Sequence, residues 1–515
     1  LSALAMYALR FVWRKYILGT ANRLGRILRY RLFEHFTRMS PSFYQTYRTG
    51  DLMAHATNDI NAVVGVAGGG VMSAVDASIT ALVTVLTMFF VLDWRLTLIA
   101  ILPLPFMAWG TSLIGRKNHE SFKAAQEAFS DLNNKVQESV TGIKVTKSFG
   151  YQDAETAAFA RINQDVFKKN ILAAKYNALF DPMVLIFVGL SYLLTLIFGG
   201  LFISQDQLTV GELVTFITYL DMLVWPLQAM GYLFNISQRG TVSYERIESL
   251  LAQESDVIEV ASPIKDIKNG RLDYSIQKFA YDDRPTLRDI HFSIDQGQTL
   301  GIVGVTGSGK TTLLRLLLRE QDIQDGNICL AGHDIRDYSL SALRSLIGYV
   351  PQDQILFATS IRDNIRFGNP SLSDEDVIAV TKLCGIYEDI MQMPDGFDTL
   401  VGERGVSLSG GQKQRLAMCR ALILNPDILI LDDSLSAVDA KTEHLILDNL
   451  KRERSGKTTL ITAHRLSAVV HADLILVLDQ GRVIESGSHQ ELLTQDGWYA
   501  TTYQNQQLAE SLEEV

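Results

Sequence analysis

The sequence predicts a protein of two unlike parts, an α-helical transmembrane domain followed by an α/β domain built on a parallel sheet. Three observations predict this division. Long apolar runs with almost no charge lie before residue 240, and charged residues are plentiful after residue 265. A glycine-rich segment at 304–311 stands between a strand-like and a helix-like stretch. At 515 residues, the chain is also too long for one ordinary domain.

The composition narrows the possible functions. A formal net charge of −10 argues against a nucleic-acid-binding surface, which is normally basic. The three cysteines, Cys329, Cys384 and Cys419, form no CxxC pair and all fall in the second part. They need no role beyond core packing, and a reducing compartment suits that part of the chain.

Four segments have the length and composition of membrane-spanning helices. They are residues 71–92, 96–115, 182–205 and 213–234. Each is close to the roughly 20 residues that cross hydrocarbon as a helix. Asp76 and Asp221 are the only charged residues in all four segments. Pro182 and Pro226 are candidate kinks, because proline breaks the helical hydrogen-bond ladder.

Basic residues orient these helices. The segments 22–60 and 116–175 are rich in Arg and Lys, whereas the short turns 93–95 and 204–209 hold one arginine between them. The positive-inside rule places the two long segments in the cytoplasm and the two turns outside. Helical spacing in the long segments indicates that the membrane helices continue well into the cytoplasm. A weaker span at 2–20, interrupted by basic residues, makes five crossings, so we expect that a first membrane helix is missing.

The glycine-rich segment Gly-Val-Thr-Gly-Ser-Gly-Lys-Thr at 304–311 fits the pattern G-x-x-x-x-G-K-[ST]. Its glycines allow backbone N–H groups to surround phosphate oxygens at a helix N-terminus. Lys310 supplies positive charge to the β- and γ-phosphates, and the Thr311 hydroxyl suits a Mg²⁺ ligand. ATP and Mg²⁺ are therefore the predicted ligands. The predicted nucleotide contacts here are Gly304, Thr306, Gly307, Ser308, Gly309, Lys310, Thr311 and Thr312.

A second phosphate-site element is the apolar run 428–431, which ends in Asp432 and Asp433. The run predicts a central parallel strand that is buried on both faces. Asp432 stands at its carboxyl end, where open α/β sheets bind ligands, and we expect it to hold Mg²⁺ directly or through water.

The segment Ser409-Gly410-Gly411-Gln412 precedes a helical run at 413–424. As a helix N-terminus it could receive an anion. Serine is equally a good N-cap, so a plain capped loop explains the same residues. The residues alone leave both interpretations open.

The glycine-rich loop, the segment Leu-Ser-Gly-Gly-Gln at 408–412, the run 428–433 and His464 within Ile-Thr-Ala-His-Arg together resemble the ATP-binding cassette family. The resemblance covers roughly residues 270–503. It implies that Tyr281 stacks on adenine and that His464 is the switch histidine at the γ-phosphate. A core tyrosine and a structural histidine are the alternatives for these two residues.

The same resemblance gives Gln352 a contact with Mg²⁺ and a role in sensing the membrane domain. The metal ligands implied are thus Thr311, Gln352 and Asp432. It also implies that the loop 436–439, with Asp439, crosses a dimer interface, and that 401–405 is an exporter-specific loop. In this family each ATP lies between the glycine-rich loop of one cassette and residues equivalent to Ser409, Gly410, Gly411 and Gln412 of the other.

The first part of the chain resembles the type IV exporters at 49–52, 57–59 and 147–150, which look like their cytoplasmic loops. The expected fold class is therefore an exporter-type α-helical transmembrane domain, lacking its first helix, joined to an α/β P-loop NTPase cassette. We expect a transmembrane domain at 1–240, a linker at 241–269, the cassette at 270–503 and a C-terminal tail at 504–515. The loops near 48–58 and 149–155 match the coupling helices of that group.

One position departs from the family pattern. Most active cassettes have Glu where this chain has Asp433, and that acid polarises or deprotonates the attacking water. Asp is one methylene shorter, a retreat of roughly 1.5 Å, and a misplacement of about 1 Å can cost on the order of 10²-fold in rate. With His464 and Gln352, Asp433 completes the predicted catalytic set. We predict that this site binds ATP but hydrolyses it slowly, unless Asp433 works nearly as well as Glu.

The predicted function is ATP-driven export of hydrophobic or amphipathic compounds across a bacterial cell membrane, with the cassette in the cytoplasm. The predicted partners are the lipid bilayer and a second half-transporter, a heterodimer being favoured over a homodimer, and no nucleic acid. Asp76 and Asp221 could attract cationic cargo or face neighbouring helices. A set of large side chains could line an adaptable cavity, although packing or lipid contact also explains it: Met72, Met107, Trp225 and Phe234. A dedicated lipid or peptide exporter, or a regulatory subunit with little hydrolysis, are the alternatives.

Overall fold

The computed structural model describes residues 2–281, 284–402 and 408–513. The chain divides into two compact units. One contains the residues up to Glu34 together with Gly50–Ala252, and the other contains His35–Thr49 together with the residues from Gln253 onward. The passage from the first unit to the second at Ala252 lies within the segment 241–269 that the sequence predicts as the linker.

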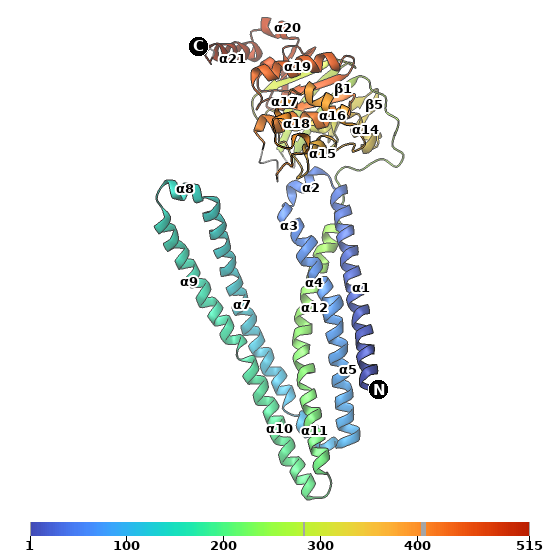
Figure 1. The fold of residues 1–515 in the computed structure, drawn as a ribbon, viewed down its shortest axis with the longest axis vertical. Helices are drawn as coiled ribbons and strands as arrows, with labels where there is room; N and C mark the ends of the chain where they lie inside the picture. Colours follow the sequence, from blue (N-terminus) through green and yellow to red (C-terminus); the bar gives the residue numbers. More distant parts are fainter. Residues whose placement is uncertain (1, 282–283, 403–407, 514–515) are drawn as a thin grey trace. The chain divides into compact units, whose positions relative to one another are not determined.

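The first unit is helical throughout its described residues (Figure 1). Its first helix is α1 (Ser2–Arg38). The next long helix joins three α-helical stretches through wider π-helical turns: α3 (Thr49–Ala54), η1 (His55–Asp59), α4 (Ile60–Gly65), η2 (Val66–Gly70), α5 (Val71–Thr87) and η3 (Met88–Leu92). The remaining helices are α6 (Trp94–Ile101), α7 (Leu104–Thr141), α8 (Ile143–Ser148), α9 (Gln152–Asn177), α10 (Phe180–Ser204), α11 (Val210–Met222) and α12 (Val224–Leu251).

Four continuous helical stretches among the described residues are long and apolar enough to cross a membrane. They are Thr49–Leu92, Trp94–Thr141, Gln152–Ser204 and Val210–Leu251. Each contains one of the four predicted spans, and each continues well beyond it, as the basic flanking segments indicate. At most 22% of the most apolar window of each helix is buried inside the protein. Apolar side chains therefore cover the outside of this unit, as lipid contact requires.

Local chemistry sets the ends of these helices. Asp93 caps α6, because its carboxylate accepts from the N–H groups of Arg95 and Leu96. Thr209 and Glu212 form a capping box at the start of α11. The predicted kinks take the form of helix starts, since α10 and α12 begin just ahead of Pro182 and Pro226. Proline is tolerated in a first turn because its missing N–H has no intrahelical partner there.

The cytoplasmic reversals lie slightly earlier than the sequence resemblance places them. The turns are made at α2 (Pro41–Thr46) and at α8, whereas 48–58 and 149–155 fall largely on the helices that follow. In Figure 1, α8 joins the antiparallel pair α7 and α9, which pack along each other. Elsewhere in the first unit, the buried Asp59 of η1 accepts from Ser243 of α12 at 2.8 Å, so the motif at 57–59 holds two long helices together.

The second unit holds two β-sheets. A four-stranded sheet runs in the order β2-β1-β4-β5 and a six-stranded sheet in the order β10-β9-β3-β8-β7-β6. Their strands are β1 (Leu272–Tyr281), β2 (Arg284–Ile294), β3 (Thr299–Gly304), β4 (Asp325–Leu330), β5 (His333–Asp334), β6 (Ile347–Val350), β7 (Ile428–Asp432), β8 (Thr458–Thr462), β9 (Leu474–Asp479) and β10 (Arg482–Gly487). The larger sheet is parallel except for its edge strand β10.

Helices cover these sheets. They are α13 (Lys310–Leu317), α14 (Leu340–Ser345), α15 (Ile361–Ile365), α16 (Asp374–Leu383), α17 (Tyr387–Met391), α18 (Gly410–Leu422), α19 (Ala440–Glu453), α20 (His489–Thr494) and α21 (Trp498–Glu513). Every residue of β7 and β8 is buried, which confirms the predicted interior strand at 428–431. Cys384 and Cys419 are buried in the same core, as expected for packing residues.

The register of the parallel strands brings the predicted motifs together. Ile302 of β3 and Asp432 of β7 both align with Thr462 of β8. The carboxyl ends of these three adjacent strands therefore meet at one edge of the sheet. This edge carries the glycine-rich loop, Asp432 with Asp433, and the segment that leads to His464.

Candidate nucleotide-binding site

The glycine-rich loop adopts backbone conformations that only glycine takes easily. Gly304, Gly307 and Gly309 have φ angles of 141°, 81° and 104°. A Cβ atom on Gly304 would lie 2.0 Å from the carbonyl oxygen of Leu478. The loop ends at the N-terminus of α13, which begins at Lys310. The glycines are thus needed for a tight loop that ends in a row of free helix N–H groups.

Lys310 and Ser308 point their polar groups into this loop. The Lys310 Nζ donates to the carbonyl oxygens of Gly304 at 2.9 Å and Val305 at 3.0 Å. Burial lowers the pKa of the Lys310 ammonium, and the charges of Asp433 and Asp432 oppose that shift. The buried Ser308 Oγ has no hydrogen-bond partner among the described residues. A phosphate group would satisfy that hydroxyl and the loop N–H groups, so these residues fit the predicted ligand.

Asp432 lies against three hydroxyl groups. Its Oδ1 accepts from Thr311 Oγ1 at 2.9 Å and from Thr462 Oγ1 at 2.8 Å, and its Oδ2 accepts from Tyr349 at 3.3 Å. The predicted ligands Thr311 and Asp432 are therefore neighbours, as a hard oxygen site for Mg²⁺ requires. Their geometry fits that ion, which binds through one or two protein oxygens and the substrate's phosphates.

Asp433 is held in a strained but tolerated conformation. Its φ is 47°, in the left-handed region that Asp enters more readily than most residues. Its N–H donates to both the carbonyl and the hydroxyl of Thr462, at 3.1 Å and 3.0 Å. The Gln352 Nε2 lies 3.4 Å from Asp433 Oδ2, which places Gln352 at the same edge. Burial raises the pKa of the Asp433 carboxyl, against the opposing charges of His464 and Lys310.

Tyr281 and His464 flank this edge. Tyr281 is the last residue of β1, half-buried, with its ring edge-on to Phe279 at 5.1 Å. It lines a small pocket together with Arg315 of α13 and with residues of α2. His464 follows β8 with an exposed side chain, close enough to affect the pKa of Asp433.

The signature segment forms the start of α18. Ser409 is its N-cap: the Gln412 N–H donates to Ser409 Oγ at 3.2 Å, and the Ser409 N–H donates to Gln412 Oε1 at 3.0 Å. A capping box is thus present, yet Ser409 and Gly410 remain exposed. The two interpretations of this segment are therefore compatible, since a capped helix N-terminus can still face an anion.

The loop 436–439 packs beside that segment. A Cβ atom on Gly411 would lie 2.8 Å from the carbonyl oxygen of Ala437, so this glycine permits close approach of the loop. Asp439 caps α19, and a hydrogen bond from the Thr442 N–H holds the pKa of Asp439 below its ordinary value. Of the predicted loop 401–405, residues 403–405 lie outside the described residues.

Comparisons with known proteins agree with this arrangement. Residues 1–227 match the family model described as the ABC transporter transmembrane region, and residues 287–436 match the one described as ABC transporter. The chain is 45% identical to the probable multidrug resistance ABC transporter ATP-binding/permease protein YheI of Bacillus subtilis, over 98% of this chain and 86% of that protein. This chain belongs to the ABC transporter family.

Two further matches extend this ABC transporter's likeness over its whole length. It is 42% identical to the multidrug resistance-like ATP-binding protein MdlA of Escherichia coli, over 100% of this chain and 88% of that protein. A solved bacterial Atm1-family ABC exporter with ATP bound matches with a TM-score of 0.84 and 30% identity, over 98% of this chain and 89% of that one. The chain is an ATP-driven exporter that couples ATP hydrolysis to transport. It spans a bacterial cell membrane several times and keeps its cassette in the cytoplasm.

None of the predicted cargo residues of this ABC transporter lines the cavity of about 430 Å³ in the first unit. The Tyr192 hydroxyl of α10 donates to Asp221 at 3.1 Å, so Asp221 faces a neighbouring helix, and Asp76 is half-buried on α5. That cavity has small and apolar walls instead. Its lining is Ala77, Ser78, Ala81, Val85, Ile101, Leu104, Pro105, Ala108, Leu223, Pro226 and Leu227.

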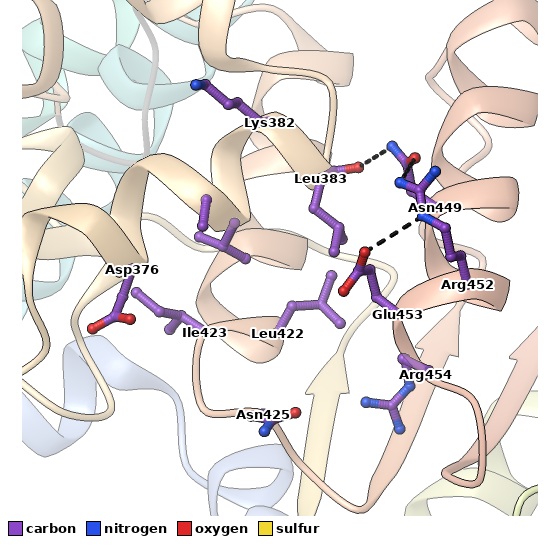
Figure 2. Close-up of a pocket in the computed structure, with 12 residues that line it drawn as sticks. Asp376, Lys382, Leu383, Leu422, Ile423, Asn425, Asn449, Arg452, Glu453 and Arg454 are labelled. Carbon is purple, nitrogen blue, oxygen red and sulfur yellow. Dashed lines mark hydrogen bonds and ion pairs between the residues drawn. The ribbon is translucent and has the colours of Figure 1, made fainter.

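Another pocket in the cassette lies away from the ATP motifs. Figure 2 shows this cavity of about 490 Å³, between α16, the end of α18 and α19. Some of its polar groups are paired within the pocket: Asn449 donates to the Leu383 carbonyl at 3.1 Å, and Arg452 lies 3.4 Å from Glu453. None of the predicted nucleotide contacts lines it.

Tyr349 and Gln506 are among the residues near the ATP site that were not predicted from the sequence. Tyr349 of β6 contacts Asp432 and lies shortly before Gln352. Its hydroxyl in an otherwise apolar strand is the sequence signal that could have identified Tyr349 as a site residue. Gln506 of α21 contacts the backbone on both sides of Arg465. No local pattern marks Gln506, because its partners lie about forty residues away.

Proposed function

We propose that this chain exports hydrophobic or amphipathic compounds as one half of a heterodimer, with a slow ATP site of its own. The observation that carries the proposal is Asp433, a shortened acid held at a rigid position beside an otherwise complete site. In this proposal residues 1–240 are the transmembrane domain, 270–503 the cassette, 241–269 the linker and 504–515 the tail.

The residues at the sheet edge have distinct roles in ATP binding. The loop N–H groups and Lys310 hold the phosphates, and Tyr281 holds the adenine. Thr311, Asp432 and Gln352 would hold Mg²⁺, which would neutralise phosphate charge when bound. His464 would contact the γ-phosphate. The fit of Ser308 and of the Thr311–Asp432 pair supports this assignment.

The position of Asp433 explains a slow site. Its N–H is bonded twice to Thr462 in a buried strand, so the backbone cannot advance to make up for the shorter side chain. A retreat of the carboxylate by roughly 1.5 Å then persists at the attacking water, and such a displacement costs on the order of 10²-fold in rate. The raised pKa of Asp433 makes it a better base once ionised, but it does not restore reach.

The signature helix supports a partner. Ser409, Gly410, Gly411 and Gln412 head α18 with the Ser409 end exposed. Among the described residues, the charged groups that touch this segment are Asp389, which accepts from Gln412, and Arg415, and these two are paired with each other. An anion bound at this N-terminus would come from another cassette. We propose that this intact segment completes a faster site on the partner subunit.

The cavity in the first unit supports an apolar or amphipathic cargo. Its volume of about 430 Å³ lies in the ordinary range of small-molecule sites. Aliphatic side chains and two prolines line it, with the Ser78 hydroxyl as the one polar side chain of the lining, so the walls give little fixed polar selectivity. The multidrug names of YheI and MdlA point in the same direction. A dedicated lipid or peptide exporter remains the second candidate, because the same walls would suit an acyl chain.

The test is co-purification of this chain with the product of an adjacent gene, followed by ATPase measurement. Asp433→Asn in this chain should leave most of the turnover, and the equivalent change in the partner should abolish it. Fast ATPase from a homodimer of this chain, unchanged by Asp433→Glu, would refute the slow-site proposal. Efflux of a cationic dye and of a neutral lipid probe from vesicles containing the complex would then separate the two cargo candidates.

A further inference from the structure

The C-terminal helix α21 reaches the segment that carries His464. The Gln506 Nε2 donates to the His464 carbonyl at 2.9 Å, and the Leu466 N–H donates to Gln506 Oε1 at 2.8 Å. Both distances are those of well-formed hydrogen bonds. We propose that Gln506 is a positioning residue for His464, so that α21 is a working part of the ATP site. This inference rests on the proposed contact of His464 with the γ-phosphate.

The two bonds fix the backbone around the switch histidine. A single amide holds the peptide groups on both sides of Arg465, which restricts the torsion angles that direct the His464 side chain. Only an amide side chain offers one donor and one acceptor in this fork, and the partners' polarity fixes its orientation. Leu466 is fully buried, so the far end of the turn is already anchored.

Gln506 belongs to a firmly held helix. The N–H groups of Trp498 and Tyr499, at the start of α21, donate to the two oxygens of Glu485 at 2.6 Å and 3.1 Å. A carboxylate at a helix N-terminus is also favoured by the helix dipole. Tyr499 is fully buried, and its hydroxyl lies 2.8 Å from His489 Nδ1. A side chain carried by this helix can therefore hold a loop in place.

A second contact holds the same segment from the other side. The buried Glu443 of α19 accepts from Ser467 at 3.2 Å and from Arg465 at 3.5 Å. The turn after β8 is thus clamped between α19 and α21, and the His464 side chain itself is exposed. A catalytic group is most effective when the residues behind it already hold its geometry.

This placement predicts a specific defect. Loss of the Gln506 clamp should weaken the contact of His464 with the γ-phosphate and leave the contacts of the other phosphates intact. ATP affinity should therefore fall while ADP affinity stays the same. A purely structural contact would lower the affinity for both nucleotides or for neither.

The test uses the full chain in lipid nanodiscs and titrates fluorescent mant-ATP and mant-ADP. Gln506→Leu should weaken mant-ATP binding about tenfold, the size expected for loss of this pair of hydrogen bonds, and change mant-ADP binding less than about twofold. Gln506→Glu keeps the acceptor for Leu466 but loses the donor, and it should give the same pattern. The matched control is Gln504→Leu, an exposed glutamine on the same helix.

His464→Ala separates this inference from the proposed function. It should also weaken mant-ATP selectively, and Gln506→Leu added to it should have no further effect. If His464→Ala leaves the preference for ATP unchanged, the proposed role of His464 fails. If His464→Ala acts as expected but both Gln506 variants leave the preference unchanged, weaken both nucleotides equally, or add fully to His464→Ala, the role of Gln506 is overturned.

Discussion

The cassette has two helix N-termini that the sequence connects with phosphate, and they differ in what surrounds them. At α13, Lys310 and Ser308 converge on the loop, with the Asp432 and Thr311 pair beside it. At α18, Ser409 and Gln412 satisfy each other in a capping box, and the helix end is exposed. The first N-terminus carries Lys310 and the proposed metal ligands, whereas the charged groups beside the second, Asp389 and Arg415, are paired with each other.

Under the proposed function, this difference explains how one chain can carry every motif and still need a partner to complete its sites. A helix N-terminus with a hydroxyl binds phosphate weakly alone, because the dipole and N–H groups are worth little at an exposed surface. Converging charges favour phosphate binding at the α13 end, and in the proposed function the α18 end receives a nucleotide that another cassette brings. Experiments that change one helix end at a time can therefore separate the two sites.

The largest effect should come from lengthening the acid beside the α13 site. Asp433→Glu should raise ATP turnover at this site on the order of 10²-fold, because the carboxylate regains its reach. Single-turnover hydrolysis in the complex, with the partner's own acid replaced by its amide, measures this directly. Asp433→Asn is the control, and its rate of ATP hydrolysis should remain at the background level. An unchanged rate in Asp433→Glu would mean that Asp433 already serves as well as Glu.

A smaller effect is expected at the α18 end. Ser409→Ala should lower the steady-state ATPase of the complex about tenfold, since it removes a contact to the partner's nucleotide worth roughly 1.4 kcal/mol. ATP binding at this chain's own loop should not change. Ser373 forms the same kind of capping box at the start of α16, so Ser373→Ala should lose a similar cap of about 1 kcal/mol but keep its turnover. An equal loss of turnover in Ser409→Ala and Ser373→Ala would mean that Ser409 acts only as a helix cap.

The parts of this site that the sequence predicted are those that depend on local pattern. The apolar run 428–431 and the loop 304–311 lie on a strand end and a helix start, as their periodicity and glycines predicted. The α18 helix begins at Gly410, a few residues ahead of the predicted run at 413–424, because Ser409 supplies the cap. Interactions between residues that are close in the sequence determine the strand, the loop and the start of α18.

Contacts between distant segments could not be predicted in that way. The helix α21 runs through the boundary drawn between the cassette and a tail at 504, because Glu485 caps its start and Tyr499 anchors it. Large side chains such as Trp225 and Phe234 are exposed rather than gathered around the cavity of the first unit. A single helix pattern shows which face is apolar, but not whether lipid or another helix covers it.

A finer test of the α13 end concerns its proposed metal site. Tyr349→Phe removes a hydrogen bond to Asp432 and should raise the Mg²⁺ concentration needed for half-maximal ATPase about fivefold, somewhat less than the loss of a group that orients a metal ligand usually causes. Turnover at saturating Mg²⁺ should stay close to that of the unchanged protein. Tyr274→Phe is the matched control, since that buried hydroxyl has no hydrogen-bond partner among the described residues. A lower rate at saturating Mg²⁺ with an unchanged Mg²⁺ requirement would contradict a role through Asp432.

The smallest expected effect is a pH dependence of stability that belongs to Asp433 alone. Burial raises the pKa of Asp433 above its ordinary value of 3.8, so the folded protein holds this proton more tightly than the unfolded chain. The free energy of unfolding should therefore fall as pH rises from 3.8 through the raised pKa of the folded state, and level off above it. Asp433→Asn cannot ionise, so denaturant unfolding of both proteins across that range should show the original losing stability relative to the variant. An original protein that gains stability relative to Asp433→Asn would show that Lys310 and His464 outweigh burial. Asp433 would then be kept ionised at the α13 end by the neighbouring positive charges. The difference between the α13 and α18 ends would in that case be one of charge alone.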